Sequence, residues 1–185
     1  TLASAWGIAQ SLRAAGVPVR LKWPNDLVLA GRKLGGILTE SRISAARLTW
    51  SVIGVGINWA NPVPANGIGL KSFPMPLNAD GIDSLERLAA AVLMGIVSGY
   101  YRCQHPDRAQ FVADYEKLLI NLGQMVQLPD EQSGHLGKVV GVSSRGNLRL
   151  RALVKSLGNS SAAALTERSS EIEYQPGAIA LGYNT

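Results

Sequence analysis

Apolar positions follow helical spacing at the start of the chain and then change to the spacing of strands. They recur every three or four residues from Leu2 to Leu12, and Gly16 ends that run, so the pattern predicts a helix. Four runs rich in β-branched or alternating apolar residues follow, separated by turn residues. These runs are residues 19–23, 27–29, 36–42 and 49–57. The first part of the chain is therefore predicted to form one four-stranded sheet preceded by a helix.

Helical spacing returns after a loop, over 59–81, that is rich in Pro, Asn and Gly. Asp83 and Glu86 have the spacing of a capping box, which predicts a helix over 83–101. A proline suited to a first helical turn predicts another helix over 106–120. We expect these two helices to cover the sheet.

Short strands dominate beyond residue 123. They are predicted at residues 125–128, 136–142, 148–154 and 178–181. The Ser/Ala-rich stretch from Ser156 to Ser170 is predicted to be a loop. The pattern indicates a small β-barrel or half-barrel, and hence an α+β chain with two domains, residues 1–122 and 123–185.

Composition narrows the functional classes. The chain has 185 residues, of which 46% are hydrophobic and 17% charged, as in a globular protein. The formal charge of +5 comes from scattered basic residues, without a basic run interleaved with aromatic residues, so we expect no DNA binding. An acidic protein partner or a phosphate-bearing ligand would use the same charge. Cys103 is the single cysteine, which favours a reducing, cytoplasmic setting without a disulfide framework.

The apolar segment from Leu85 to Tyr101 is too short to span a bilayer and contains charges, so we expect a buried helix and no membrane partner. Residue 1 is Thr1, and the pattern of a secretory leader does not follow it. We therefore expect the chain to be part of a longer protein.

Lys33 and Asp26 are the first candidates for chemistry. Lys33 precedes Gly35 and Gly36, which let a ligand approach the backbone, so its ammonium could neutralise a carboxylate or phosphate. The alternative for Lys33 is a solvated hairpin lysine. Asp26 follows a turn and either bonds its own backbone, orients an amine or holds magnesium. Lys22 is either a site residue or a surface charge.

The segment Gly54-Val55-Gly56-Ile57-Asn58 is the second candidate. Glycines inside a strand usually mark close approach by a ligand or another backbone. A dinucleotide fingerprint is not supported, because the third glycine and a following helix are missing from the pattern. His105 and His135 have no partners at metal-ligand spacing, and the four tryptophans are as expected for core residues.

Together these residues resemble the biotin protein ligase family, also called biotin–[acetyl-CoA-carboxylase] ligase. The resemblance lies in the run Lys22-Trp23-Pro24-Asn25-Asp26, in Lys33, in Gly35-Gly36-Ile37-Leu38 and in Gly54-Val55-Gly56-Ile57-Asn58. It implies that biotin and ATP with Mg²⁺ form biotinyl-5′-AMP, and that biotin is then transferred to a lysine of a biotin carboxyl carrier protein of acetyl-CoA carboxylase.

The resemblance also implies roles for individual residues. Lys33 and Asp26 would be catalytic, with Asp26 acting as a base, as an orienting group or as a Mg²⁺ ligand. The biotin-binding residues would be Lys33, Gly35, Gly36, Ile37, Gly54 and Gly56. The nucleotide-binding residues would be Lys22, Trp23, Asn25 and Asn58.

The implied fold is an antiparallel or mixed sheet covered by helices, as in class II aminoacyl-tRNA synthetases and biotin ligases, with an SH3-like barrel at the C-terminus. A homodimer would also fit the family. Its members carry an arginine- and glycine-rich loop before the helix that opens this sequence, so we expect an N-terminally incomplete catalytic domain. The alternatives are a truncated, non-catalytic binder of biotin or its adenylate, and a related lipoate ligase.

Overall fold

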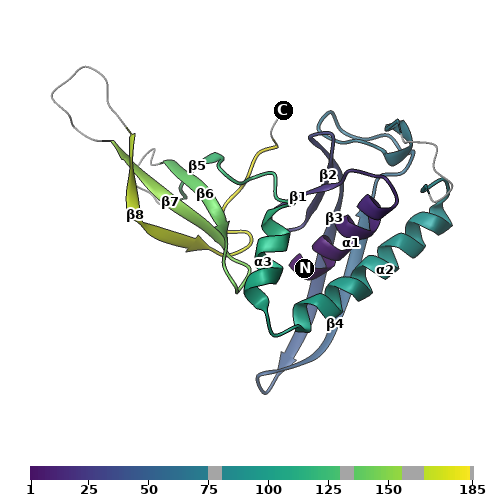
Figure 1. Cartoon of the computed structure of the whole chain (residues 1–185), viewed down its shortest axis with the longest axis horizontal. Coiled ribbons are helices and arrows are strands. Elements are labelled where there is room, and N and C mark those ends of the chain that lie inside the picture. The colour runs from purple at the N-terminus through teal and green to yellow at the C-terminus, as the bar shows by residue number, and fades with distance from the viewer. Residues whose placement is uncertain (75–80, 130–135, 156–164, 184–185) are drawn as a thin grey trace.

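The computed structural model describes residues 1–74, 81–129, 136–155 and 165–183, which contain two antiparallel sheets (Figure 1). The first part of the chain forms α1 (Leu2–Ala14), β1 (Arg20–Lys22), β2 (Asp26–Leu29), β3 (Arg32–Ser44), β4 (Arg47–Ile57) and a 3₁₀ turn, η1 (Leu70–Ser72). The second part forms α2 (Leu85–Gln104), α3 (Arg108–Glu116), β5 (Met125–Gln127), β6 (Leu136–Val142), β7 (Leu148–Lys155) and β8 (Leu165–Tyr174). The predicted α+β class is confirmed.

The first sheet has the order β1-β2-β3-β4, and every pair is antiparallel. Ala30 and Gly31 adopt φ values of 49° and 75°, the left-handed conformation that a tight hairpin turn requires, and they join β2 to β3. The β3–β4 hairpin is longer than the sequence pattern predicts, because pairing continues to Ser44 and Arg47 at its tip. The four predicted strands and their membership of one sheet are confirmed.

Helix α1 and helix α2 lie against the same face of this sheet (Figure 1). Ile8 and Leu12 of α1 are fully buried, as are Leu21 and Leu27 of the first two strands. Burying such side chains stabilises the fold by roughly 1.5–3 kcal/mol each. The covering helices are therefore α1 and α2, whereas the sequence pattern had predicted α2 and α3.

Glycines allow α1 and α2 to approach closely. A Cβ atom on Gly7 would lie 1.9 Å from the Gly95 carbonyl oxygen, and one on Gly99 would lie 2.1 Å from the Ala3 oxygen. These distances are far below van der Waals contact, so only hydrogen fits at these positions. The start of α2 is capped by Ser84, whose hydroxyl accepts a hydrogen bond from the Arg87 amide. The predicted capping box at Asp83 is therefore wrong by one residue.

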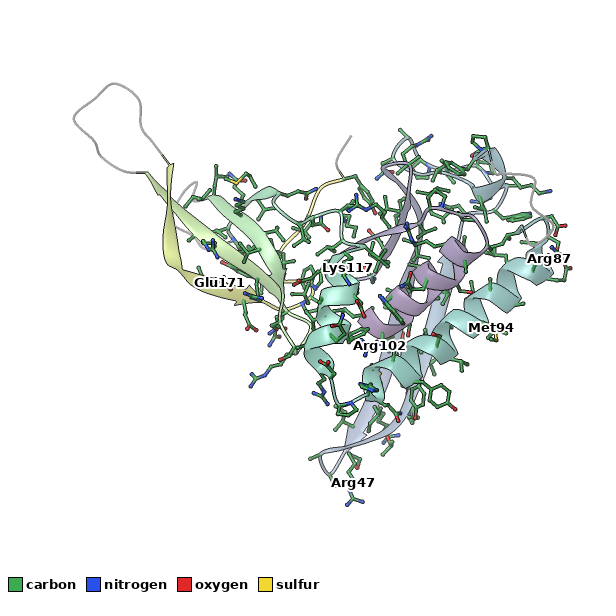
Figure 2. The ribbon with its side chains drawn as sticks, in the orientation of Figure 1. Arg47, Arg87, Met94, Arg102, Lys117 and Glu171 are labelled. Carbon is green, nitrogen blue, oxygen red and sulfur yellow. The ribbon has the colours of Figure 1, made fainter. Side chains whose placement is uncertain are left out.

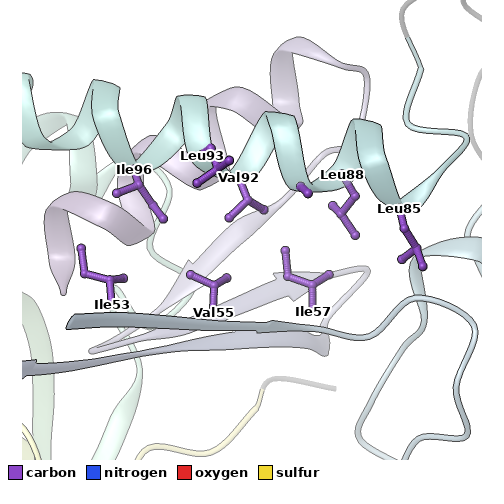
Figure 3. A pocket seen from close by; sticks show the side chains of 9 residues that line it. Ile53, Val55, Ile57, Leu85, Leu88, Val92, Leu93 and Ile96 are labelled. Atoms are coloured by element: carbon purple, nitrogen blue, oxygen red, sulfur yellow. The ribbon is translucent and has the colours of Figure 1, made fainter.

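A cavity of about 550 Å³ lies between α2 and β4 (Figure 3). Its lining is apolar, with Ile53, Val55 and Ile57 rising from the strand toward Leu88, Val92 and Ile96 of the helix. Without a charged or hydrogen-bonding side chain this cavity cannot fix a carboxylate or phosphate. The charged groups that can bind such ligands lie elsewhere in the molecule.

The second sheet has the order β5-β6-β7-β8 and is also antiparallel. Within the described residues this sheet is open, and the SH3-like barrel stays a prediction. Residues 165–170 belong to β8, so that end of the predicted loop is wrong, whereas 156–164 lie outside the described residues. The strand predicted over 178–181 is also wrong, because Ile179 and Leu181 pack against the core without strand pairing.

Helix α3 lies between the second sheet and α1 (Figure 1). Its first turn is capped by Asp107, which accepts a hydrogen bond from the Gln110 amide, so the helix begins later than predicted. The two sheets meet through Trp23, whose Nε1 donates to the Gly146 carbonyl in the β6–β7 turn at 3.0 Å. Its backbone amide donates to the fully buried Asn121 side chain at 3.1 Å. The KWPND run is therefore a junction between the two sheets.

Charged side chains are spread over separate elements. Arg47 lies at the tip of the β3–β4 hairpin, Arg87 at the start of α2 and Glu171 on the second sheet (Figure 2). No helix in the described part of the chain combines the length and the hydropathy that crossing a membrane requires.

The helix contact gives a test of the fold. Gly99→Ala is expected to destabilise the protein by about 1–3 kcal/mol, because overpacking of α1 outweighs the better helix propensity of alanine. Chemical denaturation measures the change. Ser98→Ala, at the exposed neighbouring position, is the control and should leave stability equal or slightly higher. Equal stability of both variants would mean that the helices are not packed this closely.

Candidate functional site

A row of four residues crosses the whole first sheet on the face opposite to the helices. Lys22 of β1 pairs with Asp26 of β2, Asp26 pairs with Gly36 of β3, and Gly36 pairs with Gly56 of β4. Directly opposite residues of antiparallel strands point to the same side of the sheet. The register thus brings the separate sequence motifs into one line, with charges at one end and bare backbone at the other.

Asp26 is the centre of the charged end. Its residue is only 7% exposed, and both carboxylate oxygens have partners. The Lys33 ammonium lies 2.6 Å from Oδ1, and the Lys22 ammonium lies 3.3 Å from Oδ2. The Tyr183 hydroxyl also donates a hydrogen bond to Oδ2. A carboxylate removed from water in this way is stabilised by its three donors.

These contacts decide the ionisation of Asp26. Burial by itself raises the pKa of this carboxyl, but hydrogen bonds from Lys33 and Tyr183, with the charges of Lys33 and Lys22, outweigh it and place the pKa below its ordinary value. Asp26 is therefore ionised at neutral pH. A group with a lowered pKa is a weak proton acceptor, so the geometry favours an orienting and electrostatic role over that of a general base.

Two tyrosines accompany the carboxylate. Burial, a hydrogen bond to Asp26 and the charge of Asp26 raise the pKa of Tyr183. Burial and the same negative charge raise the pKa of Tyr115. The Tyr115 hydroxyl is buried and has no hydrogen-bond partner among the described residues. Both phenols consequently stay neutral beside the carboxylate.

The surroundings of Asp26 do not fit a protein-held Mg²⁺ ion. Magnesium needs several oxygen ligands in octahedral geometry, whereas both Asp26 oxygens face ammonium or hydroxyl donors. No group of three or more His, Cys, Asp or Glu side chains that could hold a metal comes together in the described residues. The arrangement around Asp26 instead favours an anionic ligand, because two cations face one carboxylate.

Lys33 is held by its backbone while its side chain stays accessible. Its amide donates to the Asn66 carbonyl at 2.8 Å, and its carbonyl accepts from the Ile68 amide at 2.9 Å. Its side chain is 43% exposed beyond the contact with Asp26. The loop predicted over 59–81 is thus fixed here, at 66–68, against the strand that carries the lysine, while 75–80 lie outside the described residues. Lys33 is thus partly solvated, as the alternative of a solvated hairpin lysine requires, and it also forms an ion pair with Asp26.

The glycines of the site differ from one another. A Cβ atom on Gly35 would lie 2.2 Å from the Gly56 carbonyl oxygen, so Gly35 is required for the pairing of β3 with β4. A Cβ atom on Gly36 would point at Asp26, 3.4 Å from Oδ1. Gly54 and Gly56 face nearly open space. Gly36, Gly54 and Gly56 therefore leave a strip of uncovered backbone beside the charges, whereas Ile37 is buried on the opposite, helix-facing side.

The predicted nucleotide-binding residues lie in different environments. Trp23 is 1% exposed and belongs to the junction described above, so its ring is not at an open surface. The side-chain amide of Asn25 donates to the Ile37 carbonyl at 2.9 Å, which fastens the turn to β3. The side-chain amide of Asn58 donates to the Lys33 carbonyl at 3.3 Å, and Lys22 contacts Asp26. Lys22 and Asn58 lie at the site, while Trp23 and Asn25 hold its frame.

Tyr183 is the member of the site that the sequence pattern did not reveal. It is 157 positions from Asp26 along the chain. It belongs to no motif, and no spacing in the sequence relates it to the KWPND run. Only the fold brings it to the carboxylate.

Comparison with known proteins gives a consistent result. Residues 2–58 match the model of the Biotin/lipoate A/B protein ligase family, and this segment contains every site residue selected from the sequence. The chain is 27% identical over 161 residues to the Bifunctional ligase/repressor BirA of Bacillus subtilis, covering 81% of this chain and 47% of that protein. It is 37% identical over 70 residues to the Biotin–[acetyl-CoA-carboxylase] ligase of Paracoccus denitrificans, covering 37% of this chain and 29% of that protein.

The fold also has a solved counterpart. The biotin protein ligase of Aquifex aeolicus, in complex with biotin and ATP, superimposes with a TM-score of 0.65 at 23% identity, covering 99% of this chain and 70% of that chain. The likeness shows the same α+β fold with antiparallel sheets. The chain spans about half the length of the curated relatives it matches along most of its own length. The Bacillus subtilis relative is named a repressor. The comparisons therefore give no support to the expectation that this chain does not bind DNA.

The ionised Asp26 gives a pH-dependent stability. Because its folded-state pKa is lowered, it stabilises the fold above its unfolded pKa, and this contribution is lost as pH falls through the folded value. Asp26→Asn is expected to cost about 2 kcal/mol at neutral pH, since charged hydrogen bonds are lost. The difference from the unsubstituted protein should shrink in acid. Denaturation curves at several pH values measure it.

Asp83→Asn is the matched control, because the Asp83 side chain is 73% exposed and only 3.5 Å from Arg87 in a surface pair. Its cost should stay below about 1 kcal/mol. A constant difference between Asp26→Asn and the unsubstituted protein at every pH would show that Asp26 is not stabilised as an anion.

Proposed function

The chain belongs to the biotin protein ligase family, and from this premise we propose that it activates biotin with ATP and transfers biotin to a lysine of a biotin carboxyl carrier protein. The observation that carries the proposal is the row from Lys22 through Asp26 to Gly36 and Gly56, with Lys33 bound to Asp26. A fixed cation beside uncovered backbone suits a ligand with an anionic group and a neutral body.

The first step must overcome repulsion between two anions. A biotin carboxylate oxygen attacks the α-phosphorus of ATP, the bond to the bridging oxygen breaks, and pyrophosphate leaves with biotinyl-5′-AMP formed. Negative charge grows around the α-phosphate in this step. The Lys33 ammonium, accessible and tied to Asp26, is already in place to stabilise that charge without reorganising.

The second step joins the acyl group to the carrier. The neutral amine of the acceptor lysine attacks the carbonyl carbon of biotinyl-5′-AMP, an amide bond forms, AMP leaves, and the amine proton passes to solvent. Asp26 is the candidate to attract and orient the incoming amine. Because the pKa of Asp26 is lowered, we assign it orientation and not proton abstraction.

The glycine strip suits the biotin end of the site. Gly36, Gly54 and Gly56 offer bare backbone for the ligand, and Gly35 and Ile37 keep the strands beneath it in register. Lys22 and Asn58 are assigned to the nucleotide side. Trp23 and Asn25 act indirectly, because their hydrogen bonds hold the backbone that carries Lys22 and Asp26. Mg²⁺ would enter with the phosphates of ATP, because the protein side chains at Asp26 do not fit it.

The division of the molecule follows the same proposal. Residues 1–122 supply the biotin and adenylate site, and residues 123–185 form the SH3-like C-terminal domain. The carrier protein of acetyl-CoA carboxylase is the proposed partner, since the Paracoccus relative bears that carboxylase in its name. Homodimer formation remains part of the proposal.

Labelling of a carrier domain tests the function. The full-length protein that contains these 185 residues, incubated with biotin, ATP and Mg²⁺, is expected to add one biotin to the carrier lysine, as read by mass spectrometry. Binding of biotin without pyrophosphate release or labelling would point to a non-catalytic binder. Labelling of a lipoyl domain with lipoate, in place of the biotin carrier, would point to a lipoate ligase.

Lys33→Ala should reduce biotin-dependent pyrophosphate exchange by about 10²–10³-fold, as for loss of one preorganised donor to a developing charge. Lys117→Ala is the matched control, because the Lys117 side chain is 69% exposed and pairs with Asp114 on α3. Wild-type exchange by Lys33→Ala would contradict the assignment of Lys33.

Asp26→Asn is expected to impair transfer more than adenylation, since the acceptor amine loses its anionic partner. The two steps are separated by supplying pre-formed biotinyl-5′-AMP to the variant and following carrier labelling. If the variant transfers biotin as fast as the unsubstituted chain, Asp26 serves only to hold the fold.

A further inference from the structure

The C-terminal tail returns from the second sheet to the candidate site. After β8 ends at Tyr174, the chain turns at Gly177, whose φ is +89°, and then runs toward the first sheet (Figure 1). Ile179 and Leu181 pack against the core and anchor it. The tail thus crosses the junction between the sheets and ends its described course beside Asp26.

Tyr183 contacts the site through both its hydroxyl and its aromatic ring. Its hydroxyl donates to Asp26 Oδ2, the oxygen that Lys33 does not contact. The Lys22 ammonium lies 4.3 Å from the centre of the Tyr183 ring, in a cation–π contact. The tail residue therefore touches two members of the charged end of the row.

We propose that Tyr183 is a positioning residue for the biotin ligase reaction, which holds the Asp26 carboxylate in place and thereby sets how much of the Lys33 charge is available to an anionic ligand. The inference rests on the proposed function. It assigns the C-terminal tail a part in the chemistry, and it concerns a residue outside every sequence motif of the site.

The charge balance of the cluster explains the effect. A carboxylate oxygen that accepts a bond from a neutral hydroxyl shares its negative charge with a group that brings no positive charge. Without this hydroxyl, the negative charge of Asp26 would interact more strongly with the ammonium groups of Lys22 and Lys33. Lys33 would then be held more tightly, and less of its charge would stabilise the negative charge that grows in the transition state.

The orientation of the carboxylate follows from the same contacts. A carboxylate rotates about its Cβ–Cγ bond unless both oxygens are held. Lys33 on β3 holds Oδ1, whereas Lys22 on β1 and Tyr183 on the tail hold Oδ2. These groups and Tyr115 of α3 are the charged or titratable side chains that the described structure places around Asp26.

The first test is a pH titration of Asp26 in the protein without ligand. Carbon-13 NMR of the Asp26 carboxyl monitors this titration. Tyr183→Phe removes the hydroxyl and keeps the ring on Lys22. Since the hydroxyl favours the charged carboxylate, its loss is expected to move the Asp26 pKa upward. Tyr101→Phe, at a position that is 68% exposed on α2, is the control and should leave the titration unchanged. An unshifted Asp26 titration in Tyr183→Phe overturns the inference.

The second test is kinetic. The rate of biotinyl-5′-AMP formation by Tyr183→Phe should fall roughly tenfold, in line with loss of one hydrogen bond to a charged group, while KM for biotin stays within about twofold. The acid limb of the pH–rate profile should move to higher pH. A merely structural tyrosine would lower the unfolding midpoint without moving this limb, and that result overturns the inference.

The two proposals fail in different ways. If the unsubstituted chain makes no biotinyl-5′-AMP, the proposed function fails, but the carboxyl titration still decides whether Tyr183 controls Asp26. If the chain is active and Tyr183→Phe matches it in rate and pH profile, the function stands and the role of Tyr183 is lost.

Discussion

The site depends on keeping one ionised carboxylate almost out of water. Asp26 is 7% exposed, and such a burial is unfavourable unless each oxygen has a donor. Lys22, Lys33 and Tyr183 supply the donors from the two strands on either side of β2 and from the C-terminal tail. The strand register, the hairpin that carries Lys33 and the return of the tail are all needed to complete this arrangement.

Side chains alternate along each strand, so one face of the first sheet packs against the helices and the other carries the candidate site. Leu27 and Ile37 point to α1 and α2 and are buried, whereas Asp26 and Gly36 lie next to them in sequence and point the other way. One strand segment therefore supplies core packing and site chemistry together. A shift of one residue in register would exchange the faces and place the carboxylate among the helices.

The junction between the two sheets explains why the KWPND run is so mixed in character. Trp23 bonds to Gly146 of the second part, Asn25 ties the turn to β3, and Lys22 and Asp26 face the site. The run is at once a strand end, a contact between the two sheets and a source of charge. The resemblance assigns Trp23 and Asn25 to nucleotide binding. In the structure both side chains make contacts that support the residues beside them.

The sequence by itself determined the helix before the sheet and the four strands, and it singled out Lys33 and Asp26 as candidates, because periodicity, turn residues and charges next to glycines are local properties. It misplaced the last strand, since Ile179 and Leu181 alternate like strand residues but bury themselves without pairing. It could not reveal Tyr183, which is 157 positions from Asp26. Only the tertiary structure decided which distant groups meet the carboxylate, because burial and register, not spacing along the chain, select its partners.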